Sequence, residues 1–110
     1  MRISAIQKDI LFVLYALKNR GHTSSVAGTR LLSLINSQRG QDIHSSNFRA
    51  SCHTMAVHGL VVLSYSKSLK LLVGLGVDGH IIGSEIYEAR LRELQEDAAP
   101  PVRQPDVISA

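Results

Sequence analysis

The chain has 110 residues, of which 45% are hydrophobic and 19% charged, with a formal net charge of +3. This composition predicts one globular domain with a modest core, and it excludes a chain too polar to fold. A single cysteine, Cys52, excludes an internal disulfide and favours a reducing compartment, so we expect a cytoplasmic protein with no leader and no membrane-spanning segment.

The first helix is expected over about residues 5–19. Ser4 can cap it, and Gln7, three residues later, can complete a capping box. Gly21 is a natural stop for this helix. Its apolar residues recur at helical spacing and are Ile6, Ile10, Val13, Leu14 and Leu17.

Two more helices follow. The loop "HTSSVAG" leads into a short helix, "TRLLSLINS", and the polar turn "QRGQD" separates it from a third helix. Ser45 or Ser46 can cap the third helix, and Gly59 ends it. The stripe of this helix that is expected to face the core consists of Phe48, Cys52 and Met55, at spacings of four and three.

The apolar period then changes to that of β-strands. The run "LVVLSYS" is rich in β-forming residues, and a polar break at Lys67-Ser68 precedes a second run. In the second run the alternating apolar residues are Leu69, Leu71, Val73 and Leu75. Two short strands joined by a short break predict a hairpin.

A final helix is expected over residues 78–96. It carries two adjoining apolar stripes, one of Ile82, Ile86 and Ala89, the other of Tyr87, Leu91 and Leu94. Residues 97–110 hold all three prolines and show no periodicity, so we expect a disordered tail there.

The stretch "GLGVDG" matches the glycine spacing of a dinucleotide-binding turn, with Gly74, Gly76 and Gly79. That fingerprint works only between a strand and a helix of a parallel sheet, and no second parallel strand follows here. We therefore predict that these glycines join the hairpin to the last helix in a confined space. Gly79 and Gly83 are also expected to let that helix approach a neighbour closely.

The predicted order is α-α-α-β-β-α, mostly helical with one small hairpin. This is the layout of a winged helix-turn-helix, which we assign to residues 1–76, followed by a C-terminal helix over 77–96. In this layout the third helix enters the major groove of DNA, and the hairpin reaches the phosphate backbone. The predicted DNA-contacting residues are Ser45, Ser46, Asn47, Arg49 and His53 on the third helix, Lys67 and Lys70 on the hairpin, and Arg30 and Arg39 around the second helix.

The charge distribution favours a polyanionic partner. Residues 1–76 hold nine Lys or Arg and two acidic residues, whereas residues 77–110 hold three Arg and seven acidic residues. The first part is therefore basic and the second acidic. A basic body attracts nucleic acid, so we expect double-stranded DNA to be the partner.

The segment "FRASCHTMAVHGLVVLSYSKSLKLLVGL" resembles the recognition helix and wing of MarR-like and PadR-like regulators, with Met55, Gly59 and Leu60 in the shared positions. The chain as a whole is similar to small plasmid-borne winged-helix proteins, some labelled as chromosome-segregation proteins. The resemblance implies transcriptional regulation or plasmid maintenance. Two departures are a longer connection between the second and third helices, residues 37–44, and a shorter wing.

The acidic last helix is the expected dimerisation element. Its two apolar stripes exceed what one face of a small core needs, and a palindromic DNA site matches a two-fold protein. The predicted dimer residues are Ile82, Ile86, Tyr87, Leu91 and Leu94.

Other functions have weaker support in the sequence. Cys52 and His53 are consecutive helical residues that point apart, and no CxxC or HxxxH occurs, so we expect neither a metal site nor a cofactor. No motif places a nucleophile beside a base, so we expect no enzyme. A winged-helix adaptor that binds protein instead of DNA stays open, because Arg49 is the only formal positive charge on the third helix.

Overall fold

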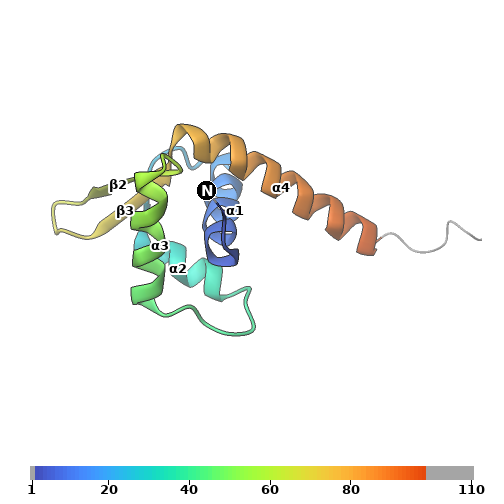
Figure 1. The fold of residues 1–110 in the computed structure, drawn as a ribbon, viewed down its shortest axis with the longest axis horizontal. Helices are drawn as coiled ribbons and strands as arrows, with labels where there is room; N and C mark the ends of the chain where they lie inside the picture. Colours follow the sequence, from blue (N-terminus) through green and yellow to red (C-terminus); the bar gives the residue numbers. More distant parts are fainter. Residues whose placement is uncertain (1, 99–110) are drawn as a thin grey trace, which may run out of the picture.

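The computed structural model describes residues 2–98 (Figure 1). The helices are α1 (Ala5–Asn19), α2 (Gly28–Asn36), α3 (Ser45–Val57) and α4 (Val77–Ala98), and the strands are β1 (Val26–Ala27), β2 (Val61–Tyr65) and β3 (Leu71–Leu75). The predicted order holds, with the two-residue strand β1 added. Part of the predicted tail belongs to α4, which extends to Ala98, and residues 99–110 lie outside the described part of the chain.

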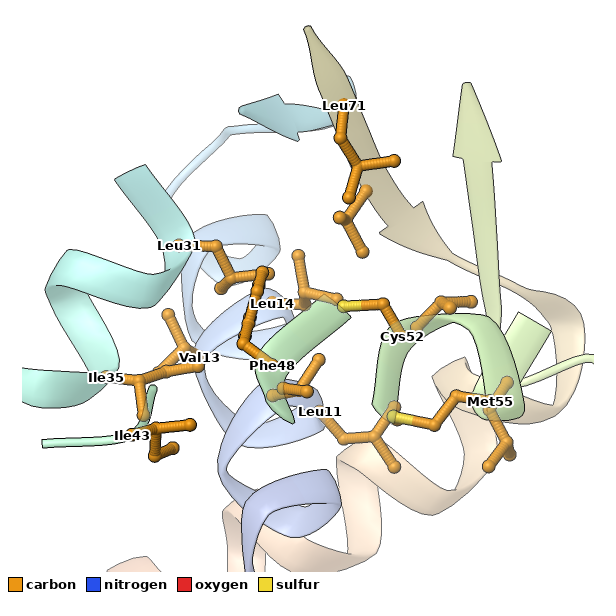
Figure 2. Close-up of a cluster of buried hydrophobic side chains, with 14 residues drawn as sticks. Leu11, Val13, Leu14, Leu31, Ile35, Ile43, Phe48, Cys52, Met55 and Leu71 are labelled. Carbon is orange, nitrogen blue, oxygen red and sulfur yellow. The ribbon is translucent and has the colours of Figure 1, made fainter. Parts of the chain in front are cut away.

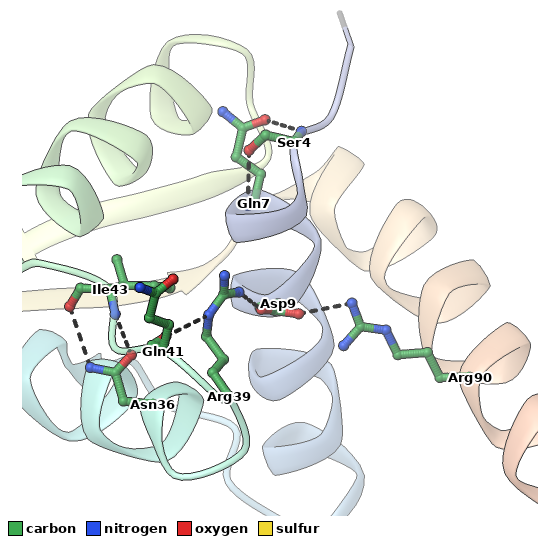
Figure 3. Close-up of polar contacts among 8 residues, drawn as sticks. All are labelled: Ser4, Gln7, Asp9, Asn36, Arg39, Gln41, Ile43 and Arg90. Atoms are coloured by element: carbon green, nitrogen blue, oxygen red, sulfur yellow. Dashed lines mark hydrogen bonds and ion pairs between the residues drawn. The ribbon is translucent and has the colours of Figure 1, made fainter.

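Helix α1 begins at the predicted capping box. The backbone N–H of Gln7 donates to Ser4 Oγ at 3.2 Å, and the backbone N–H of Ser4 donates to Gln7 Oε1 at 3.0 Å (Figure 3). These two bonds satisfy amide groups that the helix itself leaves without a partner. After the C-cap residue Arg20, Gly21 has φ of +96°, so the predicted glycine stop is confirmed.

The core is assembled from α1, α2, α3 and the sheet (Figure 2). From α1, Ile10 and Leu11 are fully buried, and α2 contributes Leu31 and Ile35. The predicted stripe of α3 is confirmed: the exposed fractions are 2% for Phe48 and 0% for Cys52 and Met55.

The sheet has three antiparallel strands in the order β1-β3-β2. Strand β1 pairs Val26 with Val73 and Ala27 with Leu72, where the sequence predicted only a loop. The prediction that Leu69 belongs to the second strand is wrong. Leu69 lies in the hairpin turn with φ of +61° and is 81% exposed, so the alternating buried pattern starts at Leu71.

The glycines between β3 and α4 fit a close approach of two backbones. The N–H of Gly76 donates to the carbonyl of Leu60 at 2.9 Å. A Cβ on Gly79 would overlap that carbonyl oxygen, and one on Gly76 would overlap the carbonyl of Gly59. The β3–α4 connection therefore lies directly on the α3–β2 turn, as predicted for a glycine-filled junction in a confined space.

Helix α4 packs along α1, and the expected dimer residues divide into two groups. Ile82 and Ile86 pack on the core of their own chain, and the ring of Tyr87 lies 5.5 Å from that of Phe12 and 5.4 Å from that of Tyr15. Leu91 and Leu94, in contrast, are 38% and 61% exposed. The structure thus gives the first three an intrachain role, and of the five only Leu91 and Leu94 are exposed. The distal part of α4 extends beyond the rest of the fold (Figure 1).

Gly83 has the role expected of it. A Cβ at this position would lie 3.4 Å from the carbonyl oxygen of Leu11 and 3.4 Å from Tyr15 Cβ, so α4 approaches α1 closely here.

No helix within residues 2–98 is long and apolar enough to cross a membrane.

We expect Gly79→Ala to lower the free energy of unfolding by about 2 kcal/mol or more, because the new methyl group would collide with the Leu60 carbonyl. In an open helix the same change would stabilise the protein, by about 1 kcal/mol. Denaturant unfolding measures the difference. The matched control is Gly40→Ala, where a Cβ meets nothing within 4 Å and should change stability by less than about 0.5 kcal/mol. Equal stabilities of the two variants would contradict the close junction.

Candidate nucleic-acid interface

Helix α3 is anchored by one face and open on the other. Phe48, Cys52 and Met55 hold it in the core, and every side chain predicted to contact DNA from this helix is exposed: Ser45, Ser46, Asn47, Arg49 and His53. At about 100° per residue, Ser46, Ala50 and His53 lie directly opposite the buried stripe, with Asn47 and Arg49 on opposite flanks. Ala50 and Thr54 are exposed on the same surface.

The predicted DNA contacts do not include Ala50 or Thr54, although the hydroxyl of Thr54 can bond to a base or a phosphate. Their angular position relative to Phe48 and Cys52 was the signal that could have identified them. A small residue at the centre of an exposed helix face permits close approach of a partner, and alanine can contact the thymine methyl group.

The N-terminus of α3 differs from the prediction. The N-cap is His44, and Ser45 and Ser46 are the first helical residues, so neither serine caps the helix. Within the described chain no side chain caps this end or that of α2. Free N–H groups at a helix N-terminus carry partial positive charge and favour an anion such as phosphate.

A groove brings three segments together beside α3. Its volume is about 280 Å³, and its polar lining consists of Thr29 at the start of α2, Ser45 and Arg49 on α3, and Lys70 at the end of the hairpin turn. The apolar lining residues include Phe48 and Leu71. Two of the predicted basic residues, Arg49 and Lys70, therefore line one concave surface although they are far apart in sequence. Thr29 is not among the predicted contacts, and its place in this groove follows from the packing of α2 beside α3 and the hairpin turn.

The hairpin turn, residues 66–70, is closed by its own hydrogen bonds. The N–H of Ser66 donates to the Lys70 carbonyl at 2.9 Å, and the N–H of Lys70 donates to Ser66 Oγ at 3.1 Å. The hydroxyls of Ser66 and Ser68 are 3.2 Å apart. Lys67 and Lys70 are both exposed, so the turn presents two ammonium groups on a fixed backbone.

Arg30 and Arg39 have different surroundings. Arg30 is exposed in the first turn of α2, next to Thr29. Arg39 forms an ion pair with Asp9 Oδ2, while Arg90 reaches Asp9 Oδ1 at 2.9 Å (Figure 3). The guanidinium of Arg39 thus tethers the α2–α3 connection to α1, and we remove it from the candidate interface.

The long α2–α3 connection is fixed at its far end as well. The backbone N–H of Ile43 donates to Asn36 Oδ1 at 2.8 Å, and Asn36 Nδ2 donates to the Ile43 carbonyl at 3.4 Å (Figure 3). Ile43 itself is buried in the core. The connection is longer than the tight turn of a simple helix-turn-helix, yet these contacts hold the start of α3 in place.

Residues 2–98 contain no candidate metal site, and their one thiol is buried. No three His, Cys, Asp or Glu side chains of this part of the chain gather as a metal site would require. Burial raises the pKa of the Cys52 thiol to about 11, which keeps it protonated at neutral pH. Cys52 packs as a small apolar residue in the core cluster.

No family model matches the sequence, and no curated protein matches it. Several solved structures resemble the fold. ZitR of Lactococcus lactis has a TM-score of 0.64 at 15% identity, over 99% of this chain and 70% of that chain. MepR, a transcription regulator of the Staphylococcus aureus multidrug efflux pump MepA, has a TM-score of 0.61 at 13% identity, over 97% and 74%.

A third similar structure is YusO of Bacillus subtilis, with a TM-score of 0.59 at 14% identity, over 97% of this chain and 70% of that chain. At such identities the likeness shows the fold alone. The predicted fold class, a mostly helical winged helix with a small sheet, is confirmed.

Proposed function

We propose that this protein is a sequence-specific double-stranded DNA-binding regulator. In this proposal α3 lies in the major groove and the β2–β3 hairpin lies on the adjacent backbone. The resemblance noted in the sequence favours a bacterial or plasmid-encoded regulator of transcription, or a plasmid maintenance factor.

One observation carries this proposal. The outer face of α3 is free of the core, and the groove at its edge brings Thr29, Arg49 and Lys70 from three elements to one surface. A major groove about 12 Å wide admits one helix, and the segments flanking that helix then meet the phosphates on either side. A surface that combines an exposed helix with basic and hydroxyl groups on its flank matches this geometry.

The side chains divide by the contacts they suit. Asn47 and Arg49 have the donor and acceptor patterns that suit adenine and guanine edges, while Ser46 and His53 can bond to either base or phosphate. Lys67 and Lys70 on the hairpin, Arg30 on α2 and the uncapped amides of α3 suit phosphate oxygens. The similarity to MepR, which is described as a transcription regulator, adds support.

We also propose that the protein acts as a homodimer. The distal part of α4 extends beyond the core, all residues from 91 to 96 are exposed, and Leu91 and Leu94 lie one turn apart on it. Exposed leucines three positions apart on a protruding helix suit antiparallel or parallel packing against a second copy. A dimer would present two α3 helices to a palindromic site.

A winged-helix adaptor is the second candidate. It is favoured by exposed apolar side chains around the end of α3 and the start of α4, where Val57 is 82% exposed, Val77 79% and Ile81 58%. In this case a protein partner would cover this surface, and the protein would not bind DNA.

Selection of binding sites from a random duplex library, followed by fluorescence anisotropy with the selected duplex, separates the two candidates. A DNA-binding protein should lose affinity steeply with salt, because each phosphate contact releases counterions. Absence of binding at low salt, or a flat salt dependence, would favour the adaptor.

Arg49→Ala is expected to weaken binding to the selected duplex by about tenfold or more, and to weaken binding to a scrambled duplex less. Its melting temperature should stay near that of the wild type, because Arg49 is exposed and has no described hydrogen bond or ion pair. Arg92→Ala removes the same charge from the exposed part of α4 and should change the affinity less than twofold. Equal losses of affinity in the two variants would mean that Arg49 acts only through its contribution to the net charge.

Sedimentation equilibrium tests the dimer. Leu91→Glu and Leu94→Glu together should shift the protein to monomer, because two carboxylates would have to be buried in the α4 contact. The matched control is Gln95→Glu, which adds a charge next to these positions and should leave the dimer intact. A wild-type protein that is monomeric at tens of micromolar would contradict the proposal.

A further inference from the structure

A second cavity lies at the opposite end of the sheet from the α3 groove. Its volume is about 210 Å³, and it is bounded by the last turn of α1, the segment that leads to β1, the ends of β2 and β3 near α4, and the first turns of α4. The groove at α3 contacts β3 at Leu71, whereas this cavity contacts it at Gly74 and Leu75. About 10 Å of extended strand therefore separates the two.

The polar lining of this cavity is basic and rich in hydroxyl groups. It contains Lys18, His22 and His80, together with the hydroxyls of Thr23, Ser24 and Ser25. Among the lining residues that the structure describes, none is acidic. The apolar remainder, including Leu14 and Val62, supplies walls without competing acceptors.

Lys18 and His80 meet directly at the edge of this cavity. Lys18 Nζ lies 3.0 Å from His80 Nδ1, which joins α1 to α4. An ammonium group has only donors, so we assign Nδ1 as the acceptor and place the imidazole proton on Nε2. The remaining ammonium protons and the Nε2–H of His80 are then donors without an assigned acceptor.

The basic residues here lack the acidic partner that the fold supplies elsewhere. Within residues 2–98 the ion pairs are those of Arg39 and Arg90, and both use Asp9. Among the residues that the structure describes, Lys18 contacts the imidazole of His80 and the face of the Tyr15 ring, with Nζ 5.8 Å from the ring centre.

Backbone geometry holds the donors in place. Gly21 turns the chain with φ of +96°, and the N–H of His22 donates to the Leu17 carbonyl at 3.0 Å, which fixes His22 beside the last turn of α1. Gly74 keeps the opposite wall open, since a Cβ there would lie 2.9 Å from Ser25 Oγ.

We propose that this cavity binds a small oxyanion, either a phosphate or a carboxylate, through Lys18, His80 and the hydroxyls of the segment 23–25. The bound oxygen atoms would accept from the ammonium, the imidazole Nε2–H and the hydroxyl groups, and would neutralise the unpaired positive charge. The volume is several times that needed for one water molecule, which leaves room for an anion of several heavy atoms. This proposal is independent of the proposed DNA binding, because every residue that would hold the anion belongs to this protein.

The test is a titration of the 110-residue protein, followed by the ring ¹H–¹³C NMR signals of its histidines. Inorganic phosphate and malonate are added separately at constant pH and ionic strength, with chloride as the balancing salt. We expect saturable shifts of the His80 and His22 signals with at least one of the two anions, and little change at His53 on α3. The anion that saturates at lower concentration identifies the class of ligand.

Lys18→Met and His80→Asn are each expected to weaken the binding at least tenfold. Lys8→Met is the matched control: Lys8 is exposed on the same helix, about 15 Å from Lys18, and its loss should change the binding less than twofold. The melting temperature should rise with the saturating anion in the wild type and in Lys8→Met, and not in Lys18→Met. Shifts that grow linearly without saturation, or equal binding by Lys18→Met and Lys8→Met, would overturn the proposal.

Discussion

The burial of three side chains on one face of α3 decides which residues of that helix remain available. Phe48 and Met55 contribute about 2 kcal/mol each by leaving water, and Cys52 contributes less because its side chain is smaller. The spacing of the three residues fixes the rotation of α3 about its own axis. Once that rotation is fixed, Ser46, Ala50 and His53 must face outward. The same burial raises the pKa of the Cys52 thiol to about 11. The proposed DNA interface therefore depends on apolar contacts that fix the orientation of α3.

The junction between the hairpin and α4 holds the end of α3, the hairpin and α4 together. Gly76 and Gly79 allow this connection to lie on the carbonyl groups of the α3–β2 turn, so the end of α3, the hairpin and α4 share one packed contact. The tethers of Asp9 to Arg39 and Arg90 join the α2–α3 connection, α1 and α4 in the same way. The proposed interface at α3 and the proposed anion cavity sit at opposite ends of the sheet, and both are supported by α1 and β3.

Local patterns were sufficient to predict much of the fold. The capping box of Ser4 and Gln7, the buried stripe of α3 and the glycine stops depend on residues within a few positions of one another. Strand β1 could not be predicted, because two residues form a strand only where β3 offers them a partner. The alternation of Leu69 with Leu71 predicts a strand residue, but the closure of the hairpin turn places Leu69 at φ of +61°.

The site was harder to predict than the fold. The exposed residues of α3 follow from its buried stripe, and the structure leaves them available. Arg39 is engaged by Asp9, 30 positions away, and Asp9 also binds Arg90, 81 positions from it. No local sequence pattern predicts contacts between residues so far apart. The division of the α4 residues between core and surface likewise depends on α1, whose side chains contact α4 from His80 to Arg90, while the exposed residues 91–96 lie beyond these contacts.

The most direct test of the account is backbone amide NMR of the ¹⁵N-labelled protein with the duplex obtained by selection. Signals of residues 29–30, 45–54 and 66–70 should shift, while those of residues 91–96 should shift only if the oligomeric state changes. An interface that leaves residues 45–54 unperturbed, or that centres on Val57, Val77 and Ile81, would contradict the assignment of the outer face of α3 to DNA.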